Sequence, residues 1–418
     1  MKLTIHRGTH EIGGSCVEIE SKGKRIVVDL GLPLDADNKN NKKYLPKIAG
    51  LDGKDPSLLG IIISHPHLDH FGLLAHISQD IRVTMGADAR RILQAAIPFL
   101  NGKWPIPAPG GDLKHLKCFD LGPFKITPFL MDHSAYDAYA LLIEADGKKL
   151  FYSGDFRAHG RKAKITEQLI VHPPTGVDVL LLEGSTLGRL DADKKFPTEV
   201  KIEERLVKIF KKTKGIGLVH ASAQNIDRFV SVFRACKRTD RKLVIDLYTA
   251  VILEATGNKH IPQSDWPEIA IFIPQSQRIQ IKRNKWFNLL THHSANRIFI
   301  ETLKEISSKA VVFFRPIHMG DLEKANCLNG AIYIYSQYEG YWEEDSYARL
   351  RAWIKKNNIR KINVHTSGHA CLTDLKRLAK SLHPKIIIPV HTFSPEKYRE
   401  YFGETVQCLN DGESFPIL

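Results

Sequence analysis

The heptapeptide Ser64-His65-Pro66-His67-Leu68-Asp69-His70 carries three imidazoles and one carboxylate within six positions. Residues 58–63 before it are apolar and rich in isoleucine and predict a buried strand, and Gly72 follows as the expected start of a helix. From a loop at the end of such a strand, the first two histidines can reach one point, and the aspartate with the third histidine a second point nearby. Because imidazole and carboxylate are ligands of Zn²⁺, the loop predicts a dinuclear metal site rather than a histidine-rich surface loop.

The composition of the 418 residues is that of an ordinary globular protein of two or three domains, with 43% hydrophobic and 25% charged residues. Lys and Arg total 60 against 46 Asp and Glu, and the net charge of +14 favours a polyanionic partner. No apolar run has the length needed to cross a membrane, and residues 1–7 lack the apolar core of a secretory signal. The six cysteines are scattered, as is typical of reduced thiols. We therefore expect a cytoplasmic protein without a membrane partner.

The pattern of predicted strands and helices changes near residue 190. Before it, alternating apolar and polar residues at 3–5, 16–19 and 25–29 are separated by glycine turns and predict a β-meander. After it, strands and helices alternate over 199–255, which indicates a parallel βαβα unit. Further predicted strands cover 124–129, 138–145, 149–153, 177–182, 215–221, 242–247, 310–314, 331–335, 362–365 and 385–390, and predicted helices cover 88–100, 165–170, 199–212, 225–237, 249–255, 346–356 and 372–381.

Three further residues with metal-binding side chains lie at the ends of predicted strands. His133 lies in a loop between two strands, where it can supply a third imidazole to the first metal. Asp155 follows a strand through a glycine that lets the backbone approach closely, and it is well placed to bridge two ions. His391 ends the last apolar strand. Each residue alone is a weak signal, but together with the heptapeptide they supply the ligands that two zinc ions need.

With these motifs the chain resembles the metallo-β-lactamase-fold hydrolases of the β-CASP branch, and within that branch most closely the ribonuclease J family. The resemblance covers nearly the whole chain, and it has three departures. Residues 98–111, rich in proline and glycine, have no recognised counterpart in the family. The C-terminal domain of that family has no counterpart in the 418 residues, and Tyr338 replaces a glycine of a family Ser-Gln-Gly-Glu loop. The motifs that carry the resemblance are HPHLDH at 65–70, DHS at 132–134, SGDFR at 153–157, LLE at 181–183, SGHA at 367–370 and PVH at 389–391.

The resemblance implies an α/β fold, a metallo-β-lactamase αββα sandwich with an inserted β-CASP α/β domain. Residues 1–190 are expected to form the first part of the sandwich domain, 191–355 the insertion and 356–418 the completing part. Two Zn²⁺ ions are implied as cofactors, with Mn²⁺ or iron as alternatives for the same ligands. The implied ligands are His65, His67 and His133 for one ion, Asp69, His70 and His391 for the other, and Asp155 between them.

Members of this branch are nucleases, and a histidine at the third β-CASP motif, here His391, is typical of the RNA-processing members. We therefore predict a zinc-dependent ribonuclease, endo- or exonucleolytic, that acts on single-stranded RNA. A water activated by two metals attacks phosphorus and leaves 5′-phosphate and 3′-hydroxyl ends. Glu183 and His369 match the first two motifs, and we expect His369, stabilised by Glu183, to be the general acid. The predicted catalytic residues are Asp69, Glu183 and His369.

The substrate-binding surface is predicted to be basic. Residues 201–260 contain thirteen Lys or Arg against six Asp or Glu, and residues 269–300 contain no acidic residue. Lys282 and Arg283 lie in that second stretch beside Trp286, a candidate for stacking on unpaired bases. The other predicted nucleic-acid contacts follow strand ends or resemble family segments, and they are Ser222, Asn225, Arg228, Arg315, His318, Ser336, Gln337 and Ser367.

Other functions are compatible with the same metal ligands. A DNA nuclease is the main alternative. A small-molecule hydrolase such as a thioesterase or lactonase explains the ligands but not the basic insertion. A non-catalytic nucleic-acid-binding subunit is disfavoured because every expected ligand is present. A homodimer is compatible with the resemblance.

Overall fold

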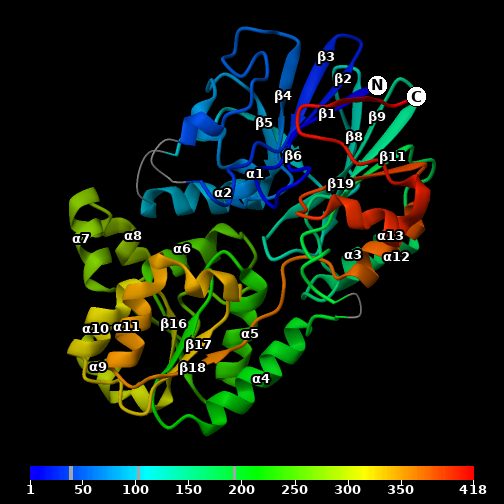
Figure 1. The fold of residues 1–418 in the computed structure, drawn as a ribbon. Helices are drawn as coiled ribbons and strands as arrows, with labels where there is room; N and C mark the ends of the chain where they lie inside the picture. Colours follow the sequence, from blue (N-terminus) through cyan, green and yellow to red (C-terminus); the bar gives the residue numbers. More distant parts are fainter. Residues whose placement is uncertain (37–40, 101–103, 192–193) are drawn as a thin grey trace. The chain divides into compact units, whose positions relative to one another are not determined.

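The computed structural model describes residues 1–36, 41–100, 104–191 and 194–418. The chain falls into two units, shown in Figure 1 with colours that follow the sequence. Unit 1 comprises residues 1–196 and 368–418, and unit 2 comprises residues 197–367. Across the described ranges, no helix is both long and apolar enough to cross a membrane.

The first sheet of unit 1 begins with the predicted meander. Its first three strands pair antiparallel in sequence order, and from β3 to β6 neighbouring strands run parallel. The last strand of the chain, β20, closes the other edge by pairing with β1. These strands are β1 (Lys2–Arg7), β2 (Cys16–Ser21), β3 (Lys24–Val28), β4 (Leu58–Ile62), β5 (Val83–Gly86), β6 (Pro109–Leu113) and β20 (Ser414–Pro416).

The second sheet of unit 1 has the order β19-β11-β10-β9-β8-β7. Strands β7 to β10 form an antiparallel meander, whereas β10, β11 and β19 run parallel. The carboxyl ends of these three parallel strands therefore lie at one edge of the sheet. The strands are β7 (Phe119–Leu121), β8 (Phe124–Met131), β9 (Ala138–Ala145), β10 (Lys148–Tyr152), β11 (Val179–Glu183) and β19 (Ile386–Val390).

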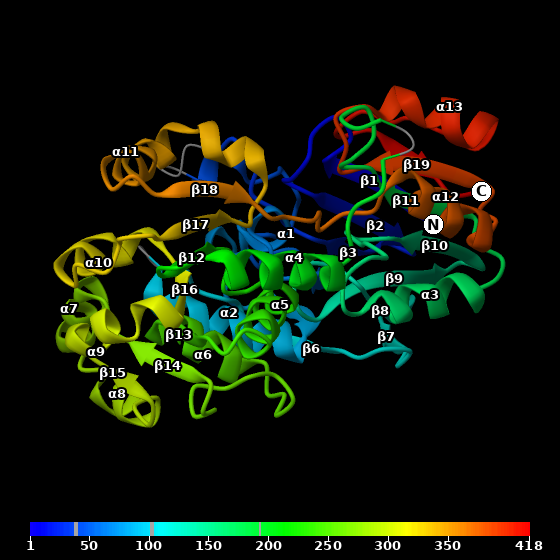
Figure 2. The ribbon, with the colours of Figure 1, turned by 90° about the horizontal axis from the view of Figure 1, so that it is seen from below.

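The two sheets share an apolar core, and helices cover their outer faces. Ile19, Leu141 and Leu181 are fully buried in the core between the sheets. The side chains that alternate with these along the strands, such as Phe151, point to the other face of the second sheet. There they pack with side chains of the helices that cover it. Figures 1 and 2 show the helices outside the sheets, which confirms the predicted αββα sandwich. The helices are α1 (Leu68–Phe71), α2 (Ala87–Ala96), α3 (Ala163–Val171), α12 (Leu372–Leu382) and α13 (Tyr398–Phe402).

Unit 2 is built on an all-parallel sheet with the order β15-β14-β13-β16-β12-β17-β18. Phe314 joins a core with apolar residues of α9 (Ile300–Glu305), α10 (Met319–Lys324) and α11 (Ala348–Lys356). The preceding Phe313 packs edge-on against Phe229 of α5 (Ile226–Lys237), with the ring centroids 5.2 Å apart. Alternate residues of the strands are therefore buried on both faces, which is consistent with the expected β-CASP domain. The strands are β12 (Gly217–His220), β13 (Lys242–Ile245), β14 (Ile269–Phe272), β15 (Arg297–Ile298), β16 (Ala310–Phe314), β17 (Ile332–Tyr335) and β18 (Arg360–Asn363).

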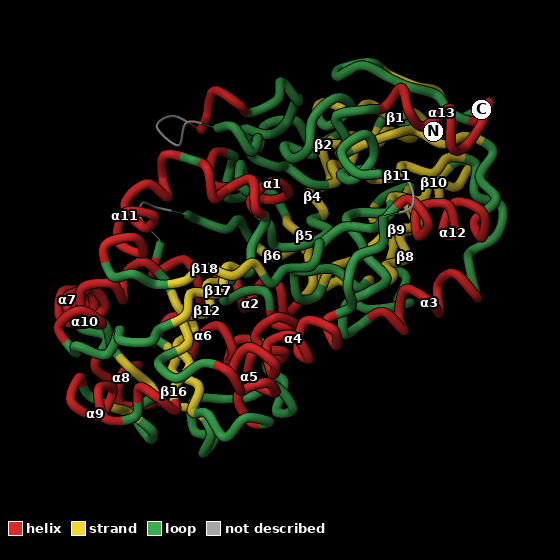
Figure 3. The backbone as a smooth tube through the Cα atoms, turned by 60° about the horizontal axis from the view of Figure 1, so that its bottom comes forward, coloured by secondary structure: helices red, strands yellow, loops and turns green. Residues whose placement is uncertain are grey.

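The helices of unit 2 lie on both sides of its sheet, as Figure 3 shows. α4 illustrates why: it buries one apolar stripe that includes Leu206 and Phe210, and its N-cap Thr198 accepts a hydrogen bond from the backbone N–H of Lys201. The helices are α4 (Glu199–Lys212), α5 (Ile226–Lys237), α6 (Leu247–Ala255), α7 (Gln275–Asn284), α8 (Phe287–His292), α9 (Ile300–Glu305), α10 (Met319–Lys324) and α11 (Ala348–Lys356).

Three local features differ from the sequence-based expectations. The expectation that a helix begins at Gly72 is wrong, because α1 begins at Leu68 and ends before this residue. Glycine is a poor helix former, so the helix does not continue through it. The helix expected over 88–100 ends at Ala96, where Pro98 enters a 3₁₀ turn. The sequence interpretation placed residues 356–418 in the sandwich domain, whereas β18 pairs with β17 and unit 2 extends to Ser367.

Candidate metal centre

The heptapeptide lies between β4 and α1, and the early start of α1 decides where its side chains point. His67 is the N-cap residue of α1 with an extended backbone, so His65 and His67 belong to the loop. Asp69 and His70 lie on the first turn of the helix. His65 and His70 are buried, at 1% and 0% exposure. The change from strand through loop to helix therefore buries His65 and His70 and leaves His67 and Asp69 partly exposed.

Three imidazoles form the first candidate ligand group. The ring nitrogens of His65, His67 and His133 offer ligand atoms that lie within 4.8 Å of one another. His133 follows β8, and its Nδ1 lies 2.6 Å from the carbonyl oxygen of Gly368. If Nδ1–H donates to that carbonyl, Nε2 keeps its lone pair and faces His67 Nδ1 at 3.2 Å. If Nδ1 of His67 also keeps its lone pair, a cation between the two nitrogens stabilises both.

The second candidate group combines two carboxylates with two imidazoles. Asp69, His70, Asp155 and His391 offer ligand atoms within 4.8 Å of one another. Oδ2 of Asp155 lies 3.2 Å from Nε2 of His70 and 3.5 Å from Nε2 of His391. The same oxygen lies 3.7 Å from Nε2 of His65, a member of the first group. Asp155 therefore lies between the two groups, where the sequence analysis expected a bridging ligand.

A buried aspartate that the sequence analysis did not identify orients the second group. Asp29 follows β3, is fully buried, and its Oδ2 lies 2.8 Å from Nδ1 of His70. The same carboxylate accepts hydrogen bonds from the backbone N–H and hydroxyl of Ser64 and from the hydroxyl of Tyr152. Its place at the end of an apolar strand was the one available signal. Asp29 holds the His70 ring with Nε2 facing Asp155, as carboxylates commonly do behind metal-binding histidines.

A buried ion pair ties together the loops that carry His133 and Asp155. Arg157 and Asp132 are both fully buried, and Nε of Arg157 lies 3.2 Å from Oδ1 of Asp132. The other oxygen of Asp132 accepts a hydrogen bond of 2.6 Å from the backbone N–H of Gly160. The residues beside the ligands in the DHS and SGDFR motifs thus have a positioning role.

The donor atoms of these groups fit bound metal ions. Among the described residues, the buried atoms without a hydrogen-bond partner include Nε2 of His65, His70 and His391 and both carboxylate oxygens of Asp155. Burying polar atoms without partners costs free energy, unless a bound ion compensates them. Nitrogen and carboxylate oxygen are the donors that Zn²⁺ accepts.

The pKa shifts of the three imidazoles in the first group agree with metal binding. Burial holds the pKa of His65 and of His133 well below the ordinary value, and it lowers the pKa of His67 to about 4. These rings are neutral at physiological pH, as metal ligation requires. For His70 of the second group, burial lowers the pKa, but the carboxylates of Asp155 and Asp29 outweigh burial and raise the pKa well above its ordinary value. Burial raises the pKa of Asp155, but His391 and His70 outweigh burial and hold the pKa well below normal.

A third cluster joins Asp155 to the two residues predicted to assist catalysis. Glu183 ends β11 and is 1% exposed. Its Oε2 lies 3.1 Å from Nδ1 of His369 and accepts a hydrogen bond from the hydroxyl of Ser185, while Nδ1 of His369 lies 3.7 Å from Oδ2 of Asp155. Burial lowers the pKa of His369, but the carboxylates of Glu183 and Asp155 outweigh it and raise the pKa to about 9. His369 is therefore held as an imidazolium, although divalent cations nearby would lower this pKa.

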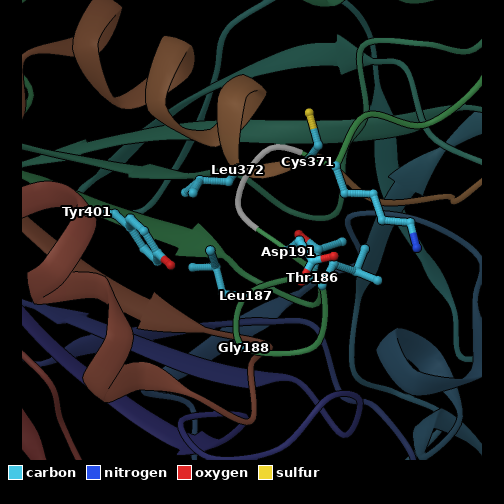
Figure 4. Close-up of a pocket in the computed structure, with 9 residues that line it drawn as sticks. Thr186, Leu187, Gly188, Asp191, Cys371, Leu372 and Tyr401 are labelled. Atoms are coloured by element: carbon cyan, nitrogen blue, oxygen red, sulfur yellow. The ribbon is translucent and has the colours of Figure 1, made fainter.

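A narrow pocket lies beside the loop that follows β11. It is lined by Leu187 and Gly188 of that loop, by Cys371 and Leu372 at the start of α12, and by Tyr401 (Figure 4). Its free space barely accommodates a water molecule. This pocket therefore offers no room for an organic substrate.

The predicted nucleic-acid contacts of unit 2 separate into exposed and buried side chains. Ser222, Lys282 and Arg283 are exposed. Arg228 is fully buried, donates to Glu199 Oε1 at 2.9 Å and contacts Ser336, which is itself buried. A phosphate contact by Arg228 would require it to leave these partners.

The remaining predicted contacts lie between these extremes. Asn225 caps α5 by accepting a hydrogen bond from the backbone N–H of Arg228. Arg315 is partly exposed and lies 2.7 Å from Asp246, while His318 is 1% exposed. Gln337 accepts a hydrogen bond from the hydroxyl of Tyr347. Trp286 and Ser367 are half-buried.

Comparison with protein families identifies two segments of the chain. Residues 11–199 match the metallo-beta-lactamase superfamily, and residues 349–402 match the Zn-dependent metallo-hydrolase RNA specificity domain. The first segment contains the heptapeptide, and the second contains His369 and His391. The chain therefore combines a segment of the metallo-beta-lactamase superfamily with the RNA specificity domain of Zn-dependent metallo-hydrolases.

Full-length similarity to individual proteins is distant. The chain is 22% identical to ribonuclease J of Helicobacter pylori (strain ATCC 700392 / 26695), over 94% of this chain and 56% of that protein. It is 20% identical to ribonuclease J of Mycobacterium tuberculosis (strain ATCC 25618 / H37Rv), over 94% of this chain and 68% of that protein. The chain thus spans about half the length of the Helicobacter relative. These similarities confirm the family predicted from the motifs.

Among solved structures, the crystal structure of a protein of unknown function from Enterococcus faecalis V583 has the same fold. The two structures superpose with a TM-score of 0.78 at 20% sequence identity, over 99% of both chains. The likeness concerns the fold of the whole chain.

Proposed function

We propose that this protein is a zinc-dependent ribonuclease that hydrolyses phosphodiester bonds of single-stranded RNA and leaves 5′-phosphate and 3′-hydroxyl ends. The observation that carries the proposal is the convergence of buried ligand atoms on Asp155 Oδ2, which lies within 3.7 Å of His65, His70 and His391. The match of residues 349–402 to an RNA specificity domain favours RNA over other substrates.

The seven residues of the two ligand groups would hold two Zn²⁺ ions, with Asp155 shared. When bound, the ions supply a water of lowered pKa and neutralise charge on the phosphodiester. The chain contributes the preorganisation of the site: Asp29 orients His70, and the carbonyl of Gly368 orients His133. The positions of the donors are thus set before substrate binds, which is the main protein contribution to electrostatic catalysis.

We assign the proton donor for the leaving 3′-oxygen to His369. Its Nδ1 is held by Glu183 at 3.1 Å and by Ser185 at 3.0 Å, so the ring presents the Nε2 edge away from Glu183. Its ring centroid lies 5.4 Å from that of His133 and 5.6 Å from that of His391. This proximity to ligands of both groups supports a role as general acid beside the metals.

We further propose that unit 2 is the β-CASP domain and that its exposed basic residues bind the RNA backbone. Lys282 and Arg283 lie in the last turn of α7 and are exposed, and Phe287 of α8 is 55% exposed. Exposed cations next to an exposed aromatic ring suit a flexible single strand, which offers phosphates and unpaired bases.

The test is cleavage of end-labelled single-stranded RNA and DNA of identical sequence by metal-replete protein. We expect cleavage of RNA with 5′-phosphate products, loss of this activity in His67→Ala, and full activity in His172→Ala, which removes an exposed histidine of the same unit. Faster cleavage of DNA would replace the proposal by a DNA nuclease. Failure on both polymers, with hydrolysis of a thioester or lactone, would identify a small-molecule hydrolase.

A further inference from the structure

A second cluster of histidines and a carboxylate lies in unit 2, outside the candidate centre described above. Glu254 lies at the end of α6, His292 is the last residue of α8, and His293 follows it. Their ligand atoms lie within 4.8 Å of one another. Thirty-seven positions of sequence separate Glu254 from the first of the histidines, so the fold brings them together.

The carboxylate of Glu254 faces both imidazoles. Its Oε1 lies 2.5 Å from Nε2 of His292, and its Oε2 lies 3.4 Å from Nε2 of His293. The two rings meet edge to face with centroids 4.8 Å apart. Both Nε2 atoms therefore point toward one carboxylate from different directions, as they do in metal sites built from two histidines and one carboxylate.

His293 distinguishes this cluster from an ordinary surface ion pair. Its side chain is 2% exposed, and its Nε2 is among the buried atoms of the described chain that lack a hydrogen-bond partner. Its other nitrogen, Nδ1, lies 2.9 Å from Oγ of Ser264. If Nδ1 carries the proton, Nε2 turns a lone pair toward a carboxylate. If Nε2 carries it, that N–H is buried without a well-formed hydrogen bond, so the ring is best satisfied with the proton on Nδ1 and a cation at Nε2.

The surroundings hold the cluster in place. The side-chain amide of Asn296 donates to the carbonyls of Ser264 and Trp266, at 3.1 and 2.9 Å. The side chain of Gln263 donates to the carbonyl of Leu253, next to Glu254, at 3.3 Å. The segment that orients His293 is thus tied to the end of α6 as well as to the strand after α8. Such supporting hydrogen bonds are typical of the residues behind metal ligands.

We propose that Glu254, His292 and His293 bind one Zn²⁺ ion that links α6 to α8 in unit 2. The three side chains supply two nitrogens and one oxygen, which leaves at least one coordination position for water. Glu254 and His292 are 49% and 62% exposed, so the ion can enter from solvent. Bound there, the ion would fix α8, which lies within the acid-free basic stretch of residues 269–300, to the end of α6.

The test is equilibrium dialysis of the whole protein against Zn²⁺, followed by measurement of zinc per chain. We expect about three ions in the wild type and about two in His292→Ala or Glu254→Gln, each with RNA cleavage unchanged. His260→Ala, which removes an exposed histidine of the same unit, should keep the wild-type count. Glu254→Gln preserves shape, so a loss of zinc in this variant cannot be attributed to misfolding of the helix.

Asp155→Asn separates this inference from the proposed function. We expect it to lose the ions of the unit 1 centre and to retain about one. An equal zinc content in wild type, His292→Ala and Glu254→Gln would overturn the inference, whatever the activity on RNA. Cobalt substitution gives a second readout: the visible absorption of Asp155→Asn loaded with Co²⁺ should disappear when His292→Ala is added, and its persistence would also contradict the site.

Discussion

The carboxyl ends of the parallel strands carry polar residues in both units, but the two units differ in whether the buried polar atoms have hydrogen-bond partners. In unit 1, Asp155 is buried with both carboxylate oxygens lacking a hydrogen-bond partner. In unit 2, Asp246 follows β13, is equally buried, and is fully paired. It accepts hydrogen bonds from Thr249 and Gln277, and Arg315 lies 2.7 Å away. Both residues are aspartates at a strand end, so the residue type alone does not separate them.

The same contrast holds for the buried arginine of unit 2. Arg228 forms an ion pair with Glu199 and donates hydrogen bonds to the carbonyl and hydroxyl oxygens of Ser336. Buried polar groups that satisfy one another stabilise and specify a fold, whereas buried donor atoms that converge without partners are stabilised only by something that binds. The comparison therefore assigns chemistry to the edge in unit 1 and a scaffold role to the paired residues of unit 2.

The largest effect is expected from Asp155→Asn, which removes the carboxylate shared by both ligand groups. Because His65, His70 and His391 all face this side chain, loss of its charge should release both ions of the centre and reduce RNA cleavage below detection. Zinc analysis and an RNA assay of the same sample check this prediction. Asp246→Asn is the matched control in unit 2 and should retain the zinc of unit 1. Undiminished RNA cleavage by Asp155→Asn would contradict the catalytic role that the comparison assigns to Asp155 in unit 1.

The next effect concerns the proton donor. His369→Ala should keep zinc and RNA affinity but reduce turnover by ~10²–10⁴-fold, the usual contribution of a general acid. A substrate with a bridging 3′-sulfur has a leaving group that does not need protonation, so its cleavage should be nearly unaffected. An equal loss on both substrates would show that His369 positions the phosphate or the loop instead.

Arg228→Ala tests the scaffold role in unit 2. It leaves Glu199 buried without its cation, and we expect the free energy of unfolding to fall by about 3–5 kcal/mol. Four of the five tryptophans lie in unit 2, so urea unfolding followed by tryptophan fluorescence reports on this unit. Arg234→Ala, on the exposed side of α5, is the control and should be nearly neutral. Weaker RNA binding with unchanged stability would instead identify Arg228 as a phosphate contact.

A smaller effect is expected from the exposed cations. Lys282→Glu with Arg283→Glu should weaken binding of single-stranded RNA by about tenfold at low salt, and the dependence of affinity on salt should become shallower by about 1.4 in log–log slope. Binding measured at several salt concentrations checks both numbers. The pair Lys211→Glu and Lys212→Glu, also exposed but on α4, controls for net charge. Equal losses in the two pairs would indicate a general charge effect and no local contact.

The smallest effect is a pH dependence of unit 2. Burial raises the pKa of Asp246, but Arg315 and His318 outweigh burial and hold the pKa below its ordinary value of 3.8. A carboxyl whose pKa is lower in the folded state stabilises the protein above its unfolded-state pKa, and this contribution is lost as pH falls through the folded-state pKa. We expect Asp246→Asn to lower stability near neutral pH and to flatten its decline below about pH 4. Parallel stability curves for both proteins would contradict this.

Much of the fold followed from local pattern. The predicted strand over 138–145 and the predicted helix over 199–212 match β9 and α4 residue for residue, because alternation and a helical apolar stripe are local properties. The segment after residue 269 was not assigned any element, although it forms β14, α7 and α8. Its helix α7 has only a weak apolar stripe, so tertiary packing against the sheet decides it.

The chain alone predicted which side chains the fold brings together in the two candidate ligand groups, because imidazoles and carboxylates placed at strand ends have few other uses. It did not reveal Asp29 behind His70, nor the pairing of Arg228 with Glu199, nor the approach of Glu254 to His292 and His293. Those contacts join residues that are far apart in sequence, and a side chain's partners are set by which strands and helices pack together. Residue types and their spacing specify what a site can bind, whereas only the folded chain decides which buried groups are satisfied and which are left for a ligand.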